Sequence, residues 1–173
     1  MTPETWHETR RTCLAYSPGG HRAELERALA GITFADAFHV TFDDGRQQPA
    51  GDDERAEPAG DDGRKPTGAP RRYHLCHPRR SVWRTAVNAW QSLLVLRRER
   101  PELVISTGAD VAVPILLLGK LCGAAVVFIE TAGSAEPTLA GRLVYPVADL
   151  FVVQWPERLA RFPRAVLAEG LLL

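Results

Sequence analysis

The sequence predicts an α/β protein of the Rossmann-like class, with one doubly wound, mostly parallel sheet and helices on both faces. Short apolar runs of strand length alternate along the chain with stretches of helical periodicity. Turns of small residues follow several of the expected strands just where a helix begins, which is typical of repeated βαβ units. The chain has 173 residues, 45% of them hydrophobic, which favours a single domain with a sizeable core.

The first strand is expected at residues 12–17 and the first helix at 20–30, after a polar and flexible N-terminus at 1–11. Between them lies Ser17-Pro-Gly-Gly-His21, where glycines allow positive φ and the first helix amides can point at an anion. The string lacks the full dinucleotide-binding spacing and the lysine of a P-loop. A plain glycine turn between strand and helix is therefore the alternative interpretation.

A second strand is expected at residues 36–42, and the composition changes after it. From 43 to 72 the only non-polar residues are Ala, Gly and Pro, and acidic residues are dense. Such a segment cannot bury enough apolar surface to offset the entropy lost on ordering. We expect a disordered insertion within a single domain spanning 12–173, one that a short loop could replace.

A short strand is expected at residues 73–76, followed by a helix at 81–98. The apolar residues of this helix recur at helical spacing and form one strong face: Val82, Trp83, Ala86, Val87, Trp90, Leu93 and Leu94. Arginines bracket it on both sides. A basic amphipathic helix bearing tryptophans can lie on an anionic membrane surface, and the alternative is a helix that packs this face into the core.

The remaining elements are expected at 103–106 (strand), 111–121 (helix), 124–129 (strand), about 139–147 (helix) and 150–153 (strand). The almost continuously apolar run 111–129 has nearly the length of a transmembrane span. Pro114, Gly119, Lys120 and Gly123 interrupt it. These breakers favour a buried helix and strand over a spanning helix.

The carboxyl ends of parallel strands meet at one sheet edge, where ligands bind in open α/β sheets. The residues expected there are Ser17, Gly19, Gly20, His21, Ser106, Thr107, Gly108, Glu130, Thr131 and Gln154. Amide-rich turns with a histidine suit a diphosphate, and a carboxylate among hydroxyls suits a sugar or serves as a general base. His21 and Glu130 are the catalytic candidates.

Composition excludes several other classes of function. Lys+Arg and Asp+Glu both number 21, so the chain lacks the basic balance of a nucleic-acid-binding protein. The three cysteines have no metal-ligand spacing, and we expect buried thiols in a reducing compartment, with no metal and no cofactor. The polar N-terminus has no apolar signal region, which favours the cytoplasm.

Several motifs, in chain order, carry a resemblance to a known family: Ser17-Pro-Gly-Gly-His21, Arg100-Pro-Glu-Leu-Val-Ile-Ser-Thr-Gly108, Val127-Phe-Ile-Glu-Thr131, Gly141-Arg-Leu-Val-Tyr-Pro146 and Val153-Gln-Trp-Pro-Glu157. Together they resemble the acceptor-side, membrane-anchoring subunit of split UDP-N-acetylglucosamine transferases, the asparagine-linked glycosylation protein 14 family. They are also similar to its bacterial exopolysaccharide counterparts of the PssD and EpsE type and, more distantly, to the N-terminal half of MurG, a GT-B glycosyltransferase.

The resemblance implies an acceptor-binding subunit that is inactive without a separate donor-binding catalytic chain. The assembled complex would transfer a sugar, which the family implies to be N-acetylglucosamine, from a UDP-sugar to a polyprenyl-diphosphate-linked sugar. By motif, Ser17, Gly19 and Gly20 with His21, then Ser106, Thr107 and Gly108, and finally Glu130 and Thr131 carry over as site residues. The sequence departs from the eukaryotic pattern at its N-terminus, so we expect peripheral attachment to the cytoplasmic face of the membrane.

The alternative function is a stand-alone Rossmann-like module that binds a nucleotide or phosphate without catalysis. The two hypotheses predict different behaviour of the isolated chain. The transferase subunit requires a partner chain for UDP-sugar turnover, whereas the binding module holds a nucleotide tightly on its own.

Overall fold

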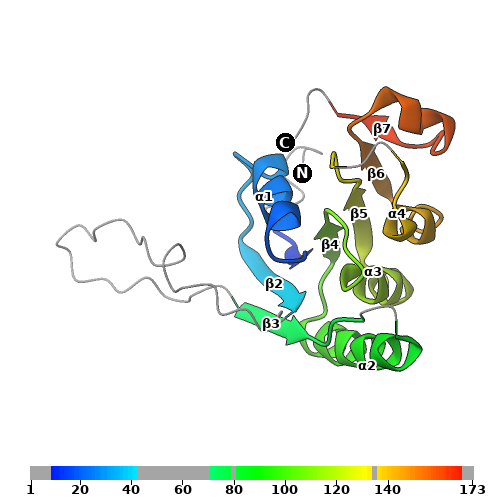
Figure 1. Ribbon diagram of the computed structural model, residues 1–173. Helices are drawn as coiled ribbons and strands as arrows, with labels where there is room; N and C mark the ends of the chain where they lie inside the picture. Colours follow the sequence, from blue (N-terminus) through cyan, green and yellow to red (C-terminus); the bar gives the residue numbers. More distant parts are fainter. Residues whose placement is uncertain (1–8, 43–70, 79–80, 134–135, 169–173) are drawn as a thin grey trace, which may run out of the picture.

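In the computed structural model, which describes residues 9–42, 71–78, 81–133 and 136–168, the chain folds around a parallel sheet of seven strands (Figure 1). The order is β3-β2-β1-β4-β5-β6-β7, and every neighbouring pair is parallel. The strands are β1 (Arg11–Ala15), β2 (Asp36–Phe42), β3 (Arg71–Leu75), β4 (Leu103–Ser106), β5 (Ala125–Ile129), β6 (Leu150–Val153) and β7 (Val166–Leu167). The strand order reverses direction between β1 and β4, which makes that position the topological switch point.

The helices cover the two faces of the sheet unequally. Helix α1 (Gly20–Ala28) lies on one face, and α2 (Val82–Glu99), α3 (Ala112–Leu121) and α4 (Leu139–Val144) lie on the other, as Figure 1 shows. A 3₁₀ helix, η2 (Pro156–Ala160), precedes β7. The larger buried cluster joins the sheet to α2, α3 and α4, whereas a smaller one around Leu14, Leu25 and Ile105 lies under α1. The Rossmann-like α/β fold predicted from the sequence is confirmed.

Most of the expected elements form within one or two residues of their predicted bounds. The expected strands at 36–42, 103–106 and 150–153 have those bounds in the structure. The apolar run 111–129 divides into α3 and β5, which confirms the buried helix and strand. Within the described residues, no helix combines the length and apolarity needed to span a membrane. The final strand β7 and the 3₁₀ helix η2 were not predicted, since each is too short to show a periodic pattern.

The structure contradicts one of the two interpretations given for helix α2, the one in which its apolar face packs into the core. The side chains it turns toward the protein include Asn88, Ser92 and Leu96, while Trp83 and Trp90 are 78% and 60% exposed. The polar pair is satisfied, because Asn88 Nδ2 donates to the Cys76 carbonyl at 2.8 Å and Ser92 Oγ donates to Asn88 Oδ1 at 3.3 Å. Packing of the predicted apolar face into the core is therefore wrong.

Strand β3 begins at Arg71, two residues before the predicted strand start at 73 and inside the predicted insertion 43–72. The rest of the predicted insertion, 43–70, lies outside the described residues. Because β2 and β3 are parallel, with Phe38 beside Arg71 and Phe42 beside Leu75, the connection has to return along the length of the strands. A short loop cannot make that return, which corrects the expectation that one could join these strands.

Candidate functional site

A pocket of about 180 Å³ opens at the carboxyl ends of the strands, at the switch point between β1 and β4. Three loops contribute to it: the turn into α1, the loop from β4 to α3, and the segment from β5 into α4. It is lined by His21, Thr107, Gly108, Ala109, Asp110, Thr131, Thr138, Leu139 and Ala140. Four of the predicted site residues therefore lie together in one cavity: His21, Thr107, Gly108 and Thr131.

His21 and Thr107 bind each other through two hydrogen bonds. The Thr107 hydroxyl donates to the His21 carbonyl at 2.6 Å, and His21 Nδ1 lies 3.1 Å from the Thr107 carbonyl oxygen. A carbonyl only accepts, so Nδ1 is the nitrogen that carries the proton. In the neutral ring Nε2 is then an acceptor, and it has no hydrogen-bond partner among the described residues. This is the tautomer that a general base toward a hydroxyl requires.

The loop after β4 brings its backbone close to the His21 ring. Gly108 and Ala109 both have positive φ, at 108° and 81°. A Cβ at Gly108 would lie 3.7 Å from His21 Cε1 and 3.6 Å from the Phe128 ring, which is ordinary van der Waals contact, so glycine serves the backbone conformation here. The buried Ser106 hydroxyl accepts a hydrogen bond from Gly108 N–H at 3.0 Å. Ser106 thus shapes this loop from beneath and does not line the pocket.

Glu24, one turn along α1 from His21, joins the first loop to the third. Its Oε1 accepts from the Thr131 hydroxyl at 2.8 Å and from the Ala132 amide at 3.0 Å. Its Oε2 is buried without a hydrogen bond and lies 3.6 Å from His21 Nδ1. The side chain is held within the protein, since Glu24 is only 6% exposed.

The threonine hydroxyls of the pocket all donate to groups of the protein itself. Thr107 donates to the His21 carbonyl, Thr131 to Glu24, and Thr138 Oγ1 to Glu130 Oε2 at 3.1 Å. Each hydroxyl has a single proton, and Thr107 is fully buried, so the oxygens of Thr131 and Thr138 are the ones that act as acceptors toward a ligand. A sugar hydroxyl can donate to them, whereas an ionised phosphate has no proton to give. The pocket itself therefore suits a hydroxylated ligand better than a diphosphate.

Glu130 lies behind the pocket, fully buried, and its carboxylate faces α4. Oε1 accepts from the Thr138 amide at 2.6 Å and lies 3.4 Å from Nη1 of the buried Arg158. The Glu130 carbonyl accepts from Gln154 Nε2 at 2.9 Å. Thr138 in turn accepts from Gly141 N–H at 2.9 Å as the N-cap of α4. The carboxylate thus fixes the start of α4, which supplies three of the pocket's lining residues.

The remaining predicted residues belong to the turn before α1. Ser17 is buried, while Gly19 and Gly20 are exposed at the helix N-terminus, Gly19 with φ of 87°. None of the three lines the pocket. The amides of this helix start are separate from the hydroxyl-rich cavity, so the structure divides the predicted residues between two places.

Sequence reasoning missed three residues that the structure brings to the site. Asp110 and Thr138 line the pocket, and Glu24 contacts His21 and Thr131 from behind. Asp110 closes the small-residue turn after the fourth predicted strand, and Glu24 is three residues from His21 on one helix face. The three-residue spacing between His21 and Glu24 is a sequence signal that could have identified Glu24. Across the described part of the chain, no cluster of three or more His, Cys, Asp or Glu side chains is placed to hold a metal ion.

The profile of the family described as "Oligosaccharide biosynthesis protein Alg14 like" matches residues 71–171. Over 166 residues the chain is 26% identical to the Homo sapiens protein named "UDP-N-acetylglucosamine transferase subunit ALG14", an alignment that covers 86% of this chain and 76% of the human one. Over 96 residues it is 33% identical to a Moorella thermoacetica protein, the "UDP-N-acetylglucosamine--N-acetylmuramyl-(pentapeptide) pyrophosphoryl-undecaprenol N-acetylglucosamine transferase". That alignment covers 50% of this chain and 24% of the bacterial protein.

Solved structures give the same fold. MurG of Acinetobacter baumannii aligns with a TM-score of 0.66 and 15% identity over 92% of this chain. The UDP-N-acetylglucosamine 2-epimerase of Rickettsia bellii aligns with a TM-score of 0.63 and 11% identity over 94% of this chain. The chain spans 45% of each of these two larger chains. A transferase and an epimerase share this fold, so the fold by itself does not select the reaction.

Proposed function

Since this chain belongs to the Alg14-like family of oligosaccharide biosynthesis proteins, we propose that it is the acceptor-binding subunit of a two-component UDP-sugar glycosyltransferase. Its acceptor is a polyprenyl-diphosphate-linked sugar, and the donated sugar is N-acetylglucosamine, as the names of the human and bacterial relatives suggest. The observation that carries the proposal is the pocket at the switch point, which combines an available histidine nitrogen with two hydroxyl oxygens in accepting roles, those of Thr131 and Thr138.

In this proposal His21 Nε2 accepts the proton of the acceptor hydroxyl. The hydroxyl oxygen then forms a bond to the anomeric carbon of the donor sugar, whose bond to the β-phosphate oxygen breaks, and UDP leaves. The Thr107 carbonyl keeps the Nδ1 proton in place, so that Nε2 faces the reaction in its basic form.

The acceptor sugar lies in the pocket, where the hydroxyl oxygens of Thr131 and Thr138 accept from its hydroxyl groups. The diphosphate extends toward the α1 N-terminus, where the amides around Gly19 and Gly20 and the helix dipole favour negative charge. The sequence prediction placed both functions on one set of residues. We now assign sugar binding to His21 and Thr131, with the buried Thr107 and Gly108 placing the His21 ring, and diphosphate binding to the turn formed by Ser17, Gly19 and Gly20.

Glu130 enters the proposal in a revised role. The sequence prediction made it a catalytic candidate beside His21, but its carboxylate is engaged by Thr138 and Arg158 and is closed off from the cavity. We propose that Glu130 is a positioning residue, which holds α4 and the pocket residues Thr138, Leu139 and Ala140 at the site.

The donor UDP-sugar binds on a second chain that closes over this edge of the sheet. The human relative is named as a subunit, which implies a catalytic partner. Turnover therefore requires both chains.

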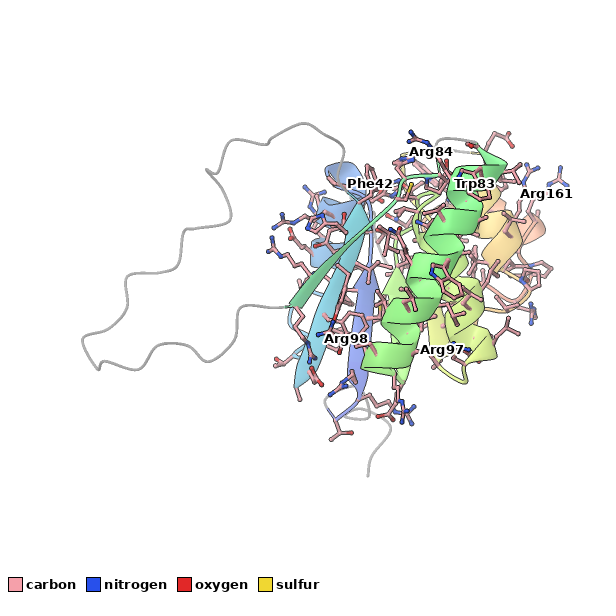
Figure 2. The ribbon with its side chains drawn as sticks, turned by 90° about the horizontal axis from the view of Figure 1, so that it is seen from below. Phe42, Trp83, Arg84, Arg97, Arg98 and Arg161 are labelled. Atoms are coloured by element: carbon pink, nitrogen blue, oxygen red, sulfur yellow. The ribbon has the colours of Figure 1, made fainter. Side chains whose placement is uncertain are left out.

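Membrane contact is peripheral and uses α2, on the cytoplasmic side. Figure 2 shows the helix from outside, with Trp83 and Arg84 at one end and Arg97 and Arg98 at the other. Exposed tryptophans suit the headgroup region, and arginines near a surface contribute about 1 kcal/mol each on anionic lipid. The exposure of Trp83 and Trp90, which leaves this face free of the core, supports the proposal.

The proposed function is tested by reconstitution. The tagged chain is purified from its native cells with the protein that binds it, and the pair is assayed with a panel of UDP-sugars and a short-chain polyprenyl-diphosphate-N-acetylglucosamine. We expect transfer from UDP-N-acetylglucosamine by the pair and none by either chain alone.

Titration of the isolated chain with UDP and UDP-N-acetylglucosamine is the complementary measurement. Weak or absent binding agrees with a donor site on the partner. Tight nucleotide binding by this chain alone, with no transfer by any reconstituted pair, would instead establish the stand-alone binding module.

A further inference from the structure

We propose that Glu24 is a positioning residue for His21, which fixes the imidazole and stabilises the positive charge that forms when Nε2 takes up a proton. The inference rests on the function proposed for His21 and extends it to a residue that the motifs did not include. The two oxygens of the buried Glu24 carboxylate differ in their hydrogen bonds.

The hydrogen bonds that join Glu24 to the loop after β5 involve only one of these oxygens. Oε1 receives both the Thr131 hydroxyl and the Ala132 amide, which fastens the loop after β5 to α1. A glutamine side chain presents the same acceptor at that place. Loop attachment therefore explains an acceptor at Oε1 but does not require a negative charge.

The second oxygen, Oε2, is buried without a hydrogen bond. A desolvated carboxylate oxygen with no donor is costly, and the cost falls when a positive charge lies beside it. The neighbouring group is the His21 ring, whose Nδ1 lies 3.6 Å from Glu24 Oε2. Both side chains come from α1, three residues apart, so the helix itself sets this separation.

The Nδ1 proton of His21 therefore lies between two acceptors, the Thr107 carbonyl at 3.1 Å and Glu24 Oε2 at 3.6 Å. The carbonyl selects the tautomer of the neutral ring. The carboxylate contributes what a carbonyl lacks, a full negative charge that stabilises the imidazolium. Proton uptake at Nε2 then strengthens the Nδ1 contact to Glu24 instead of leaving an isolated cation in a half-buried site.

The decisive variant is Glu24→Gln, because it keeps the Oε1 acceptor and the shape but removes the charge. In the reconstituted pair we expect kcat to fall by about 10-fold to 100-fold, with KM for the acceptor and the melting temperature little changed. Glu24→Asp, which restores a carboxylate, is expected to recover part of kcat. Glu26→Gln is the matched control on the same helix, since Glu26 is exposed and pairs with Arg22 at 2.8 Å.

A second readout uses the full chain without its partner. The ring ¹⁵N resonances of His21 report the tautomer and the contact at Nδ1, and Glu24→Gln is expected to shift them while Glu26→Gln leaves them in place. If no pair transfers sugar, the proposed function fails, and this comparison alone decides the role of Glu24. Unshifted His21 resonances, or an unchanged kcat in Glu24→Gln, would overturn the proposal.

Discussion

Gly141 lies directly against the carboxylate of Glu130, so closely that a Cβ at position 141 would overlap Glu130 Oε2. Glu130 cannot move aside, because Thr138 and Arg158 hold both of its oxygens in a fully buried site. Glycine is thus required within α4 for packing and not for its backbone conformation. This contact determines how closely α4 approaches the end of β5, and with it the position of one wall of the pocket.

We therefore predict that Gly141→Ala destabilises the protein, by about 1–3 kcal/mol, as expected of overpacking in a rigid core. For a chain of this size the melting temperature falls by about 2–4 °C per kcal/mol. Differential scanning calorimetry measures the change. Gly20→Ala is the control, since nothing lies within 4 Å of a Cβ there. Equal melting temperatures for Gly141→Ala and the wild type would show that the Glu130 carboxylate is not held as described.

The sheet, and the edge of it that carries the site, could be predicted because short stretches of the sequence indicate them. The strand at 103–106 is a buried apolar run, and Gly108 marks a turn whose positive φ favours glycine, so both were found from the sequence. The loops expected to meet at one edge do bring His21, Thr107 and Thr131 into one pocket. The parallel βαβ pattern carries this information, since it places successive carboxyl ends together.

What the sequence could not supply was the environment of particular side chains. Glu130 has the same position after its strand whether its carboxylate faces the cavity or faces α4, and only the tertiary contacts with Thr138 and Arg158 decide. Helix α2 presents two usable faces, and the satisfied pair Asn88 and Ser92 allows the polar one to be buried. Hydrophobic periodicity identifies an apolar face but not what covers it.

The three cysteines are predicted to differ sharply in reactivity. Burial, with the negative charge of Glu99 adding to it, raises the pKa of the Cys13 thiol far above its usual range, so the reactive thiolate does not form at neutral pH. The expectation that all three thiols are buried holds for Cys13 but is wrong for Cys122, which is exposed, and for Cys76, which is partly exposed. A thiol-specific disulfide reagent at pH 8 should modify Cys122 first, Cys76 more slowly, and Cys13 only after unfolding in denaturant. Rapid labelling of Cys13 in the native protein, located by peptide mass spectrometry, would contradict the placement of β1 in the core.

The connection between β2 and β3 is predicted to tolerate shortening only down to the length of a crossover. Replacing residues 45–69 with a Gly/Ser linker of about a dozen residues should leave the melting temperature and the circular dichroism spectrum unchanged. Phe42 pairs with Leu75, so the chain has to travel back about 13 Å to reach Arg71.

A two-residue replacement of 43–70 is the matched comparison, because it spans at most about 11 Å and cannot allow β3 to pair in its register. It should lower the melting temperature markedly. Loss of soluble, folded protein with the longer linker would show that segment 45–69 itself contributes to the fold.

Binding to lipid vesicles is predicted to depend on the exposed face of α2. Trp83→Ala combined with Trp90→Ala should weaken binding to phosphatidylglycerol-rich vesicles by at least about tenfold, since both apolar side chains are lost from the interface. Raising the salt concentration should release the wild type as well, because the arginine contribution is screened. Val166→Ala, on edge strand β7, is the control. Vesicle sedimentation gives the comparison, and equal binding of the double variant and the wild type would assign membrane contact to another surface.

The measurement that tests the central claim most directly is the kcat of His21→Asn in the reconstituted pair. Asparagine places an amide N–H where Nδ1 donates to the Thr107 carbonyl, so the fold is retained, but it has no counterpart of Nε2. We predict that kcat falls by about 10²-fold to 10⁴-fold while the melting temperature stays close to that of the wild type. His74→Asn, on the exposed side of edge strand β3, should change neither quantity. A His21→Asn pair that keeps the wild-type kcat would contradict the assignment of His21 as the base and, with it, the proposed use of this pocket.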